Sequence, residues 1–435
     1  MSNKPKKIGL ITTTSLVVGN MIGAGIFLLP ATLASYGSIS LLGWLFTAAG
    51  ALILAKIFSN MSKLFPGIGG GPYAYSKAGF GDFLGFLVAW GYWIAIWVSN
   101  AVLITAVISA LSVFFPTLKT NSILAVSIGL AIIWVITWIN SRGVASSGKF
   151  QVVTTILKLA PLAFVILVGL FFFDFDNFPA FNLTGDSDWV AVSAAASFTL
   201  FAFLGLESAS IPAANVENPE KTIPRATVFG TIIVTLVYIL GTIVLFGILP
   251  VDVLKNSPAP FAEAGKIIGG VYAGYFVAAG AAIAAIGCLN GWILMAGQLP
   301  MATAQDNMFP RIFKKENKNG APYLGLIIGS ILTSIVMLMN YTKGLVDQFT
   351  FLANLVVFTT LIPYLFVAAA YIIVIIDKKL HFNNAYKTFV LGTLGFLYSL
   401  WAIFGSGSDT VFYGFLLLMA GIPFYVLMQW HKRKI

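Results

Sequence analysis

The feature that most constrains this chain is a series of long apolar stretches that recur from one end to the other. We count twelve of them, each of roughly 20 residues, which is enough to cross ~30 Å of hydrocarbon at ~1.5 Å per helical residue. They lie at residues 10–35, 39–62, 83–113, 122–141, 150–173, 189–214, 225–249, 271–299, 322–341, 347–376, 384–405 and 409–430. The sequence therefore predicts an all-α membrane protein with twelve transmembrane helices.

The overall composition excludes a water-soluble domain. Only 9% of the 435 residues are charged and 59% are hydrophobic, whereas soluble domains contain about 25% charged residues. The formal charge of +10 is spread over short loops and is not gathered in a basic patch, so we predict no nucleic-acid partner. The lipid bilayer is the predicted surrounding of most of the chain.

Lysine and arginine residues indicate how the chain is oriented in the membrane. An even number of spans places both termini on one side, and 19 of the 25 basic residues fall on that side. Four lie on the opposite side, and the remaining two, Lys56 and Lys158, lie inside spans. Because basic loops stay in the cytoplasm, we expect both termini to be cytoplasmic and the first span to be retained rather than cleaved as a signal peptide.

Residue clusters that would support catalysis or cofactor binding are missing from the sequence. The two histidines, His381 and His431, lie far from Cys288, the one cysteine, so no metal site is predicted. The glycine-rich stretch at 67–81 follows no β-strand and joins two spans, which argues against a nucleotide site. We therefore expect no enzyme activity, no metal and no cofactor.

Two spans contain clustered glycines in their middle, where a spanning helix must satisfy its own backbone. The first contains "GNMIGAGIFLLP", and the sixth contains "FAFLGLESASIPAANVENP". These spans would open two groups of five, the places where a transporter built from inverted repeats has its interrupted helices. Half-helix ends suit a carboxylate at one break and a cation at the other, and an amino acid has both. Close helix packing is the alternative explanation for the glycines of the first span.

The sequence thus predicts a cytoplasmic tail at 1–9, a first five-helix repeat at 10–173, a second at 189–376, two appended helices at 384–430 and a short cytoplasmic tail at 431–435.

Glu207 and Lys158 are the ionisable residues that we place deep in the membrane. Burying a charge there costs several kcal/mol unless it is neutralised, paired or hydrated. Glu207 could couple protonation to the arrival of a cationic substrate, or it could be a structural acid bonded between helices. Lys158 lies about eight residues into its span, where its ammonium could contact the break in the first span or extend back to the interface. Lys56 is close enough to a membrane surface to extend to water.

Two aromatic residues stand beside polar or glycine-containing turns within their spans. Phe201 precedes Glu207 by six residues, and Trp292 follows Asn290 in the eighth span. Either ring could stack on a cationic substrate group by a cation–π attraction of ~1–2 kcal/mol.

The chain resembles the amino acid-polyamine-organocation transporter superfamily, in particular its bacterial basic amino acid/polyamine antiporters. The resemblance runs through "GNMIGAGIFLLPATLAS", "GGGPYAYSKAGFG", "FLGLESASIPAANVENPEKTIPRA", "SPAPFAEA", "GWILMAGQ", "DNMFPRIF" and "LIPYLF". It implies the LeuT-like fold, a five-plus-five inverted repeat with two appended helices, and alternating access around a midplane site. It also implies a multi-pass protein of the bacterial inner (plasma) membrane, and it allows a homodimer.

The resemblance also implies a set of site residues. Those expected to bind the substrate are Asn20, Ala24, Gly25, Ala95, Ile96, Asn100, Leu103, Phe201, Leu204, Trp292 and Asn354. Those expected to gate the site or couple it to protons are Tyr92, Glu207, Tyr364 and Lys158. Lys158 could take the place that a coupling sodium ion occupies in related folds, or it could release a proton itself.

Departures from the family pattern leave the substrate open. Phe201 stands where arginine/agmatine exchangers have a tryptophan. Asn354 resembles the corresponding residue of putrescine exchangers, and Lys158 resembles the fifth-helix lysine of superfamily members that carry neutral or mixed amino acids. The leading interpretation is an antiporter or proton-coupled carrier of basic amino acids and their amines, namely arginine, lysine, ornithine, agmatine and putrescine. A neutral or broad-range amino acid permease is the alternative, and a non-transporting amino acid sensor is a remote one.

Overall fold

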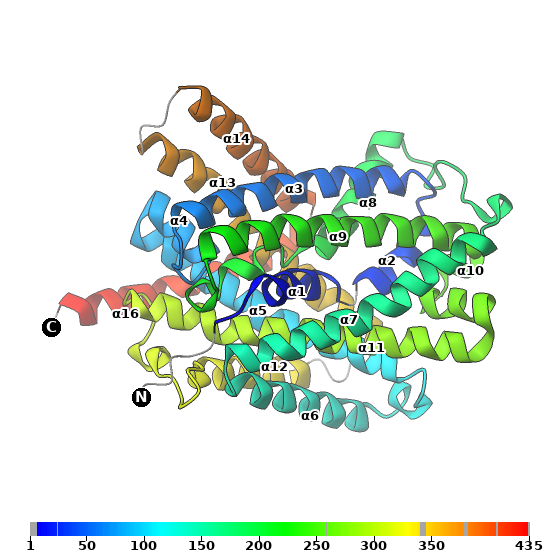
Figure 1. The fold of residues 1–435 in the computed structure, drawn as a ribbon, viewed down its shortest axis with the longest axis horizontal. Coiled ribbons are helices and arrows are strands. Elements are labelled where there is room, and N and C mark those ends of the chain that lie inside the picture. The colour runs from blue at the N-terminus through cyan, green and yellow to red at the C-terminus, as the bar shows by residue number, and fades with distance from the viewer. Residues whose placement is uncertain are drawn as a thin grey trace.

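The computed structural model of the protein describes residues 7–23, 25–257, 259–339, 345–377, 382–405 and 408–433. Within these ranges, side chains are described except at 119, 345–355, 357, 377, 382–384, 408–410 and 431–433. The described residues form a bundle of α-helices and short 3-10 helices (Figure 1). Their β structure is limited to an isolated bridge between Ile8 and Val216.

The α-helices are α1 (Leu10–Met21), α2 (Gly25–Ala34), α3 (Ser40–Leu64), α4 (Pro72–Phe80), α5 (Asp82–Leu111), α6 (Ser122–Ser141), α7 (Val144–Gly169), α8 (Asp188–Leu200), α9 (Pro219–Ile248), α10 (Val251–Lys255), α11 (Pro260–Gln305), α12 (Tyr323–Met339), α13 (Leu345–Asp377), α14 (Phe382–Gly405), α15 (Ser408–Met419) and α16 (Gly421–Arg433). The 3-10 helices are η1 (Pro116–Lys119), η2 (Leu170–Phe172), η3 (Phe175–Asn177), η4 (Phe201–Phe203), η5 (Ser208–Ser210), η6 (Ala213–Asn215) and η7 (Arg311–Lys314).

The predicted multi-span architecture is confirmed. Eleven stretches of the described chain are long and apolar enough to cross a membrane, and α12 is a shorter apolar helix of 17 residues. Several helices exceed the predicted stretches: α11 starts at Pro260 and kinks at Gly269 and Gly270. Apolar patterning detects the part of a helix that lies in lipid, whereas polar end turns beyond it escape detection. The last predicted span, 409–430, is divided between α15 and α16.

Helix packing follows the order expected for two related groups of five spans. The first span packs on the seventh (α1 on α9), and the sixth packs on the second (α8 on α3). Likewise the fifth span packs on the eighth (α7 on α11), and the tenth packs on the third (α13 on α5). The remaining central pairs, α3 with α9 and α5 with α11, each join one span to the span five places later. The contacts therefore fit the five-plus-five repeat, while its exact boundaries remain predictions.

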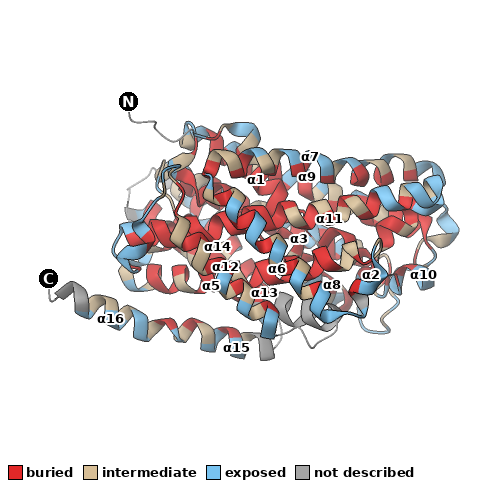
Figure 2. Cartoon of the chain, turned by 90° about the horizontal axis from the view of Figure 1, so that it is seen from below, coloured by how far each residue is buried: buried red, intermediate tan, exposed pale blue. Residues whose placement is uncertain are grey.

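The two ends of the described chain lie at the same end of the bundle. Figure 1 shows α16 and α4 at that end and α10 at the opposite one. Helices α15 and α16 run along one side of the bundle and expose much of their surface (Figure 2). The helix α4 lies in the sequence between the second and third spans, and apolar patterning did not detect it. It packs on α5 and α13.

The predicted interruptions of the first and sixth spans are confirmed. Helix α1 ends at Met21 and α2 begins at Gly25. In the sixth span, α8 ends at Leu200 and the chain continues in short 3-10 turns as far as Asn215. Gly205 has a φ of +105°, a conformation that L-residues rarely adopt, and a Cβ there would lie 3.2 Å from the Cβ of Asn20. The two breaks thus approach each other closely at Gly205.

We expect the substitution Gly205→Ala to lower the thermal unfolding temperature of the purified protein. Its methyl group would add backbone strain of about 1–2 kcal/mol and would also force Asn20 away. Gly185→Ala is the matched control, because Gly185 has a φ of +78° with no atom within 4 Å of a Cβ. Equal losses in the two variants would contradict a close contact between the breaks.

Candidate functional site

A cavity lies between the two interrupted spans, in the middle of the bundle. Its void volume, counted with its open mouth, is about 420 Å³. The residues that line it come from the first, third, sixth, eighth and tenth spans and are Asn20, Met21, Gly23, Gly25, Ser99, Val102, Leu103, Phe201, Ala202, Leu204, Cys288, Trp292 and Val356. Its placement at both helix breaks makes it the candidate binding site.

Lys158 stabilises the end of α1 at the first break. A helix leaves its last four carbonyls without intrahelical donors, and in an apolar interior such groups need partners. The ammonium of Lys158 donates to the carbonyls of Gly19 and Ile22 at 2.9 and 2.7 Å. Lys158 is fully buried, and the ion pairs found among the described residues do not include it. Its positive charge also lies where the helix dipole is negative.

Other helices supply donors for the carbonyls between these two. The hydroxyl of Tyr238, on α9, donates to the carbonyl of Met21 at 2.6 Å. On α11, the thiol of Cys288 and the indole of Trp292 donate to the carbonyl of Asn20 at 3.0 and 3.4 Å. The unwound turn is therefore held by α7, α9 and α11 together.

Glu207 lies at the second break, three residues after Leu204, and is fully buried. Its two carboxyl oxygens accept hydrogen bonds from the hydroxyls of Tyr92, on α5, and Tyr364, on α13. Tyr364 also accepts a hydrogen bond from the backbone N–H of Gly205 at 3.2 Å. The carboxyl group therefore connects the sixth span to the third and the tenth.

The two breaks are joined directly by a side-chain hydrogen bond. The amide of Asn20 donates to the hydroxyl of Ser208 at 2.9 Å. Asn20 is 3% exposed, and its side-chain oxygen has no hydrogen-bond partner in the described part of the chain. This oxygen lies against Gly291 of α11, in the place that a side chain there would occupy, and as a buried acceptor without a partner it is a candidate for a bound donor.

The structure brings together most of the residues expected from the resemblance. The predicted substrate residues that line the cavity are Asn20, Gly25, Leu103, Phe201, Leu204 and Trp292. Ala95, Ile96 and Asn100 are buried on the same helix as Leu103 but do not line it. Ala24 and the side chain of Asn354 lie outside the described residues. The roles of all these residues remain predictions.

Sequence reasoning missed several lining residues, namely Met21, Gly23, Ser99, Val102, Ala202, Cys288 and Val356. Helical spacing could have found two of them. Ser99 precedes Leu103 by four residues on α5, and Cys288 precedes Trp292 by four on α11. Residues four apart share one face of a helix, so these side chains accompany predicted ones.

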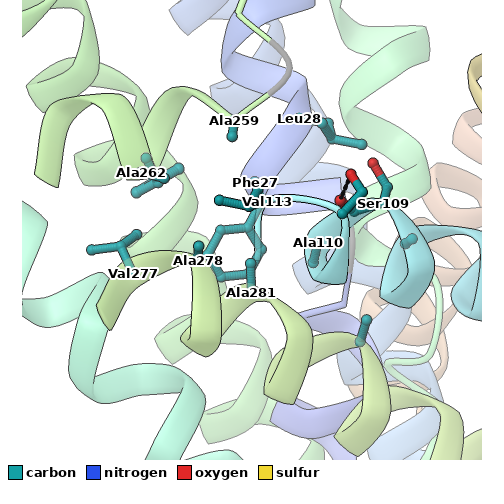
Figure 3. A pocket seen from close by; sticks show the side chains of 14 residues that line it. Phe27, Leu28, Ser109, Ala110, Val113, Ala259, Ala262, Val277, Ala278 and Ala281 are labelled. Carbon is teal, nitrogen blue, oxygen red and sulfur yellow. Dashed lines mark hydrogen bonds between the residues drawn. The ribbon is translucent and has the colours of Figure 1, made fainter. Parts of the chain in front are cut away.

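A second pocket lies about one helical turn from the cavity, towards the end of the bundle that holds α10. On α5, Ala106 of this pocket lies three residues after Leu103 of the cavity. On α11, Ala285 of this pocket lies three residues before Cys288 of the cavity. Figure 3 shows its largely apolar lining, in which Ala262, Val277 and Ala278 lie opposite Ala110 and Ser109 adds a polar side chain. The void volume is about 730 Å³ with its open mouth. This pocket and the cavity share no lining residue among those described, although both lie against α5 and α11.

The opposite end of the bundle, where the termini lie, is tied by polar contacts. Asp306, just after α11, accepts hydrogen bonds from Lys77 and Tyr73 of α4, both at 2.7 Å. Burial alone would raise the pKa of the Asp306 carboxyl, but these bonds and the Lys77 charge outweigh it and lower that pKa. The N–H of Gly70 also donates to the carbonyl of Ile211 at 3.0 Å. These contacts hold α4 and the loop before it against the end of α11 and the sixth span.

Comparisons with known proteins agree with this arrangement. The family model described as "Amino acid permease" matches residues 8–428. A cadaverine/lysine antiporter of Escherichia coli is 32% identical over 99% of this chain and 96% of its own length. An arginine/ornithine antiporter of Pseudomonas aeruginosa is 31% identical, with 96% and 89% covered, and the putrescine transporter PotE of Haemophilus influenzae is 33% identical, with 98% of each covered. The chain therefore belongs to the amino acid permease family, within the amino acid-polyamine-organocation superfamily.

Proposed function

We propose that this protein is a secondary antiporter that exchanges a basic amino acid for an amine by alternating access. The observation that carries this proposal is the end-to-end match to relatives named for lysine and cadaverine, arginine and ornithine, and putrescine. A cavity at two helix breaks, with the Glu207 carboxyl at the second break, is suited to such substrates.

In this proposal the two ends of an amino acid bind at the first break. The start of α2, at Gly25, presents backbone N–H groups and a positive dipole end to a carboxylate. The side-chain oxygen of Asn20 offers an acceptor to the amino group. Trp292 and Phe201 provide rings against the rest of the substrate.

A neutral amino acid permease is the second candidate, and the cavity lining favours it. Among the described residues, those that line the cavity include no acidic side chain, and Phe201 and Leu204 are apolar. Lys158, as a built-in cation at the first break, would then replace a coupling ion.

Ligand-induced thermal stabilisation of the purified protein separates these candidates. A ligand that binds the folded state raises its stability by RT ln(1 + [L]/Kd). Selective stabilisation by lysine, arginine, ornithine or their amines supports the antiporter. Stabilisation by small neutral amino acids alone supports the permease. Saturable counterflow in proteoliposomes would dismiss a non-transporting sensor.

The orientation that we propose places both termini in the cytoplasm of a bacterial cell. On a Cys288→Ser background, a cysteine at Lys318 should react with a membrane-impermeant maleimide only after cells are opened. A cysteine at Asp186, in the loop before α8, should react in intact cells. The reverse pattern would show the opposite orientation.

We expect Glu207→Gln to remove the dependence of uptake on pH. The amide keeps the shape of the side chain and can still accept a hydrogen bond, but it cannot take up a proton. Initial rates of labelled lysine uptake into proteoliposomes, measured across acidic and neutral pH, check this. Glu316→Gln, at an exposed position, is the control and should keep the wild-type profile. A normal profile in Glu207→Gln would remove this residue from coupling.

We expect Lys158→Met to lower the unfolding temperature and to abolish the effect of a pH gradient on uptake. The carbonyls of Gly19 and Ile22 would lose their donor, at about 1–3 kcal/mol for each unpaired group. Exchange measured at equal pH on both sides should persist. Lys56→Met is the control, because Lys56 is exposed. Gradient-driven uptake that survives in Lys158→Met would limit Lys158 to a structural role.

A further inference from the structure

Ser99 lies at the centre of the face that α5 turns towards the substrate cavity. Tyr92, which reaches Glu207, lies seven residues before it, and Leu103, which lines the cavity, lies four after it. Ala106, in the outer pocket, lies three residues further. This 7–4–3 spacing places all four on one side of a helix with 3.6 residues per turn.

The hydroxyl of Ser99 has no hydrogen-bond partner among the described residues, although the side chain is only 5% exposed. Buried serines and threonines in helices usually bond back to the carbonyl four residues earlier. Thr105, on the same helix, and Thr137, on α6, do so at 3.1 and 2.7 Å. Ser99 instead leaves a buried polar group unpaired beside a cavity, which is unfavourable unless a bound molecule supplies the partner.

Unpartnered polar atoms concentrate around this position. The side-chain nitrogen and oxygen of Asn100 and the indole nitrogen of Trp97 also have no partner in the described part of the chain. Of these residues, only Ser99 lines the cavity itself. Asn20, whose side-chain oxygen is unpaired as well, lines the same cavity from the first span.

We propose that the hydroxyl of Ser99 accepts a hydrogen bond from the side-chain ammonium of a basic substrate and so selects it over neutral amino acids. This inference rests on the proposed function. The break in the first span would hold the carboxylate and α-amino group, so the group that reaches α5 is the distal one. A neutral side chain of equal length would leave the hydroxyl buried and unpaired, and sites built for a hydrogen bond reject such analogues strongly.

Binding of lysine and norleucine, which have side chains of the same carbon length with and without the ammonium, tests the proposal. In Ser99→Ala, measured by calorimetry on the purified protein, the Kd of lysine should rise about tenfold, equivalent to ~1.4 kcal/mol. The Kd of norleucine should stay the same or fall. The unfolding temperature without ligand should not decrease, because the Ser99 hydroxyl makes no hydrogen bond to any described residue.

Val102→Ala is the matched control. Val102 lines the same cavity three residues from Ser99, and shortening it changes shape without removing a polar group. It should change the affinities for lysine and norleucine by similar factors.

Two results would overturn the inference while leaving the antiporter intact. One is lysine binding that is unchanged in Ser99→Ala, and the other is an equal loss of affinity for lysine and norleucine. A wild-type protein that binds norleucine but no basic ligand would overturn the proposed function, and this inference with it.

Discussion

The structure depends on satisfying the backbone where the first span is interrupted. Breaking a helix in the middle of a membrane exposes carbonyl groups that neither water nor lipid can bond. Here Lys158 bonds the carbonyls of Gly19 and Ile22, and Tyr238 bonds that of Met21. These donors come from α7 and α9, and α11 adds its own. The break therefore fixes how three further helices pack around it.

The interruption of the sixth span is accommodated by a glycine conformation and by hydrogen bonds to a buried carboxyl group. Gly205 takes a backbone conformation that other residues avoid, which lets the chain pass within contact distance of Asn20. The hydroxyls of Tyr92 and Tyr364 then bond both oxygens of Glu207. Because these tyrosines belong to the third and tenth spans, a change of protonation at the carboxyl group would alter hydrogen bonds to both groups of five spans. This is the physical basis for expecting Glu207 to link substrate binding to gating.

The two ends of the bundle differ in a way that suits alternating access. Around Asp306, hydrogen bonds tie α4 to the end of α11, near the termini. Towards α10, small side chains such as Ala262 and Ala278 leave an open pocket one turn from the cavity. In the proposed cycle the polar ties must break before the cavity opens to the side of the termini.

Much of the fold could be predicted from the sequence, because lipid imposes a length and a polarity on every span. Apolar stretches located the helices, and clustered glycines located both breaks before any contact was known. Polar helix ends, such as the first turns of α7 and α9, were missed because they lie outside the apolar pattern.

The sequence by itself also singled out Glu207 and Lys158, because an ionisable residue deep in a span is costly and needs a reason. It could not show which atoms satisfy them. Only the tertiary structure brings Tyr92 and Tyr364 to Glu207, since these residues lie 115 and 157 positions away. It alone shows that the Ser99 hydroxyl beside the cavity has no hydrogen-bond partner among the described residues. Burial cost is a property of one residue in its span, whereas hydrogen-bond partnership depends on helices that meet only after folding.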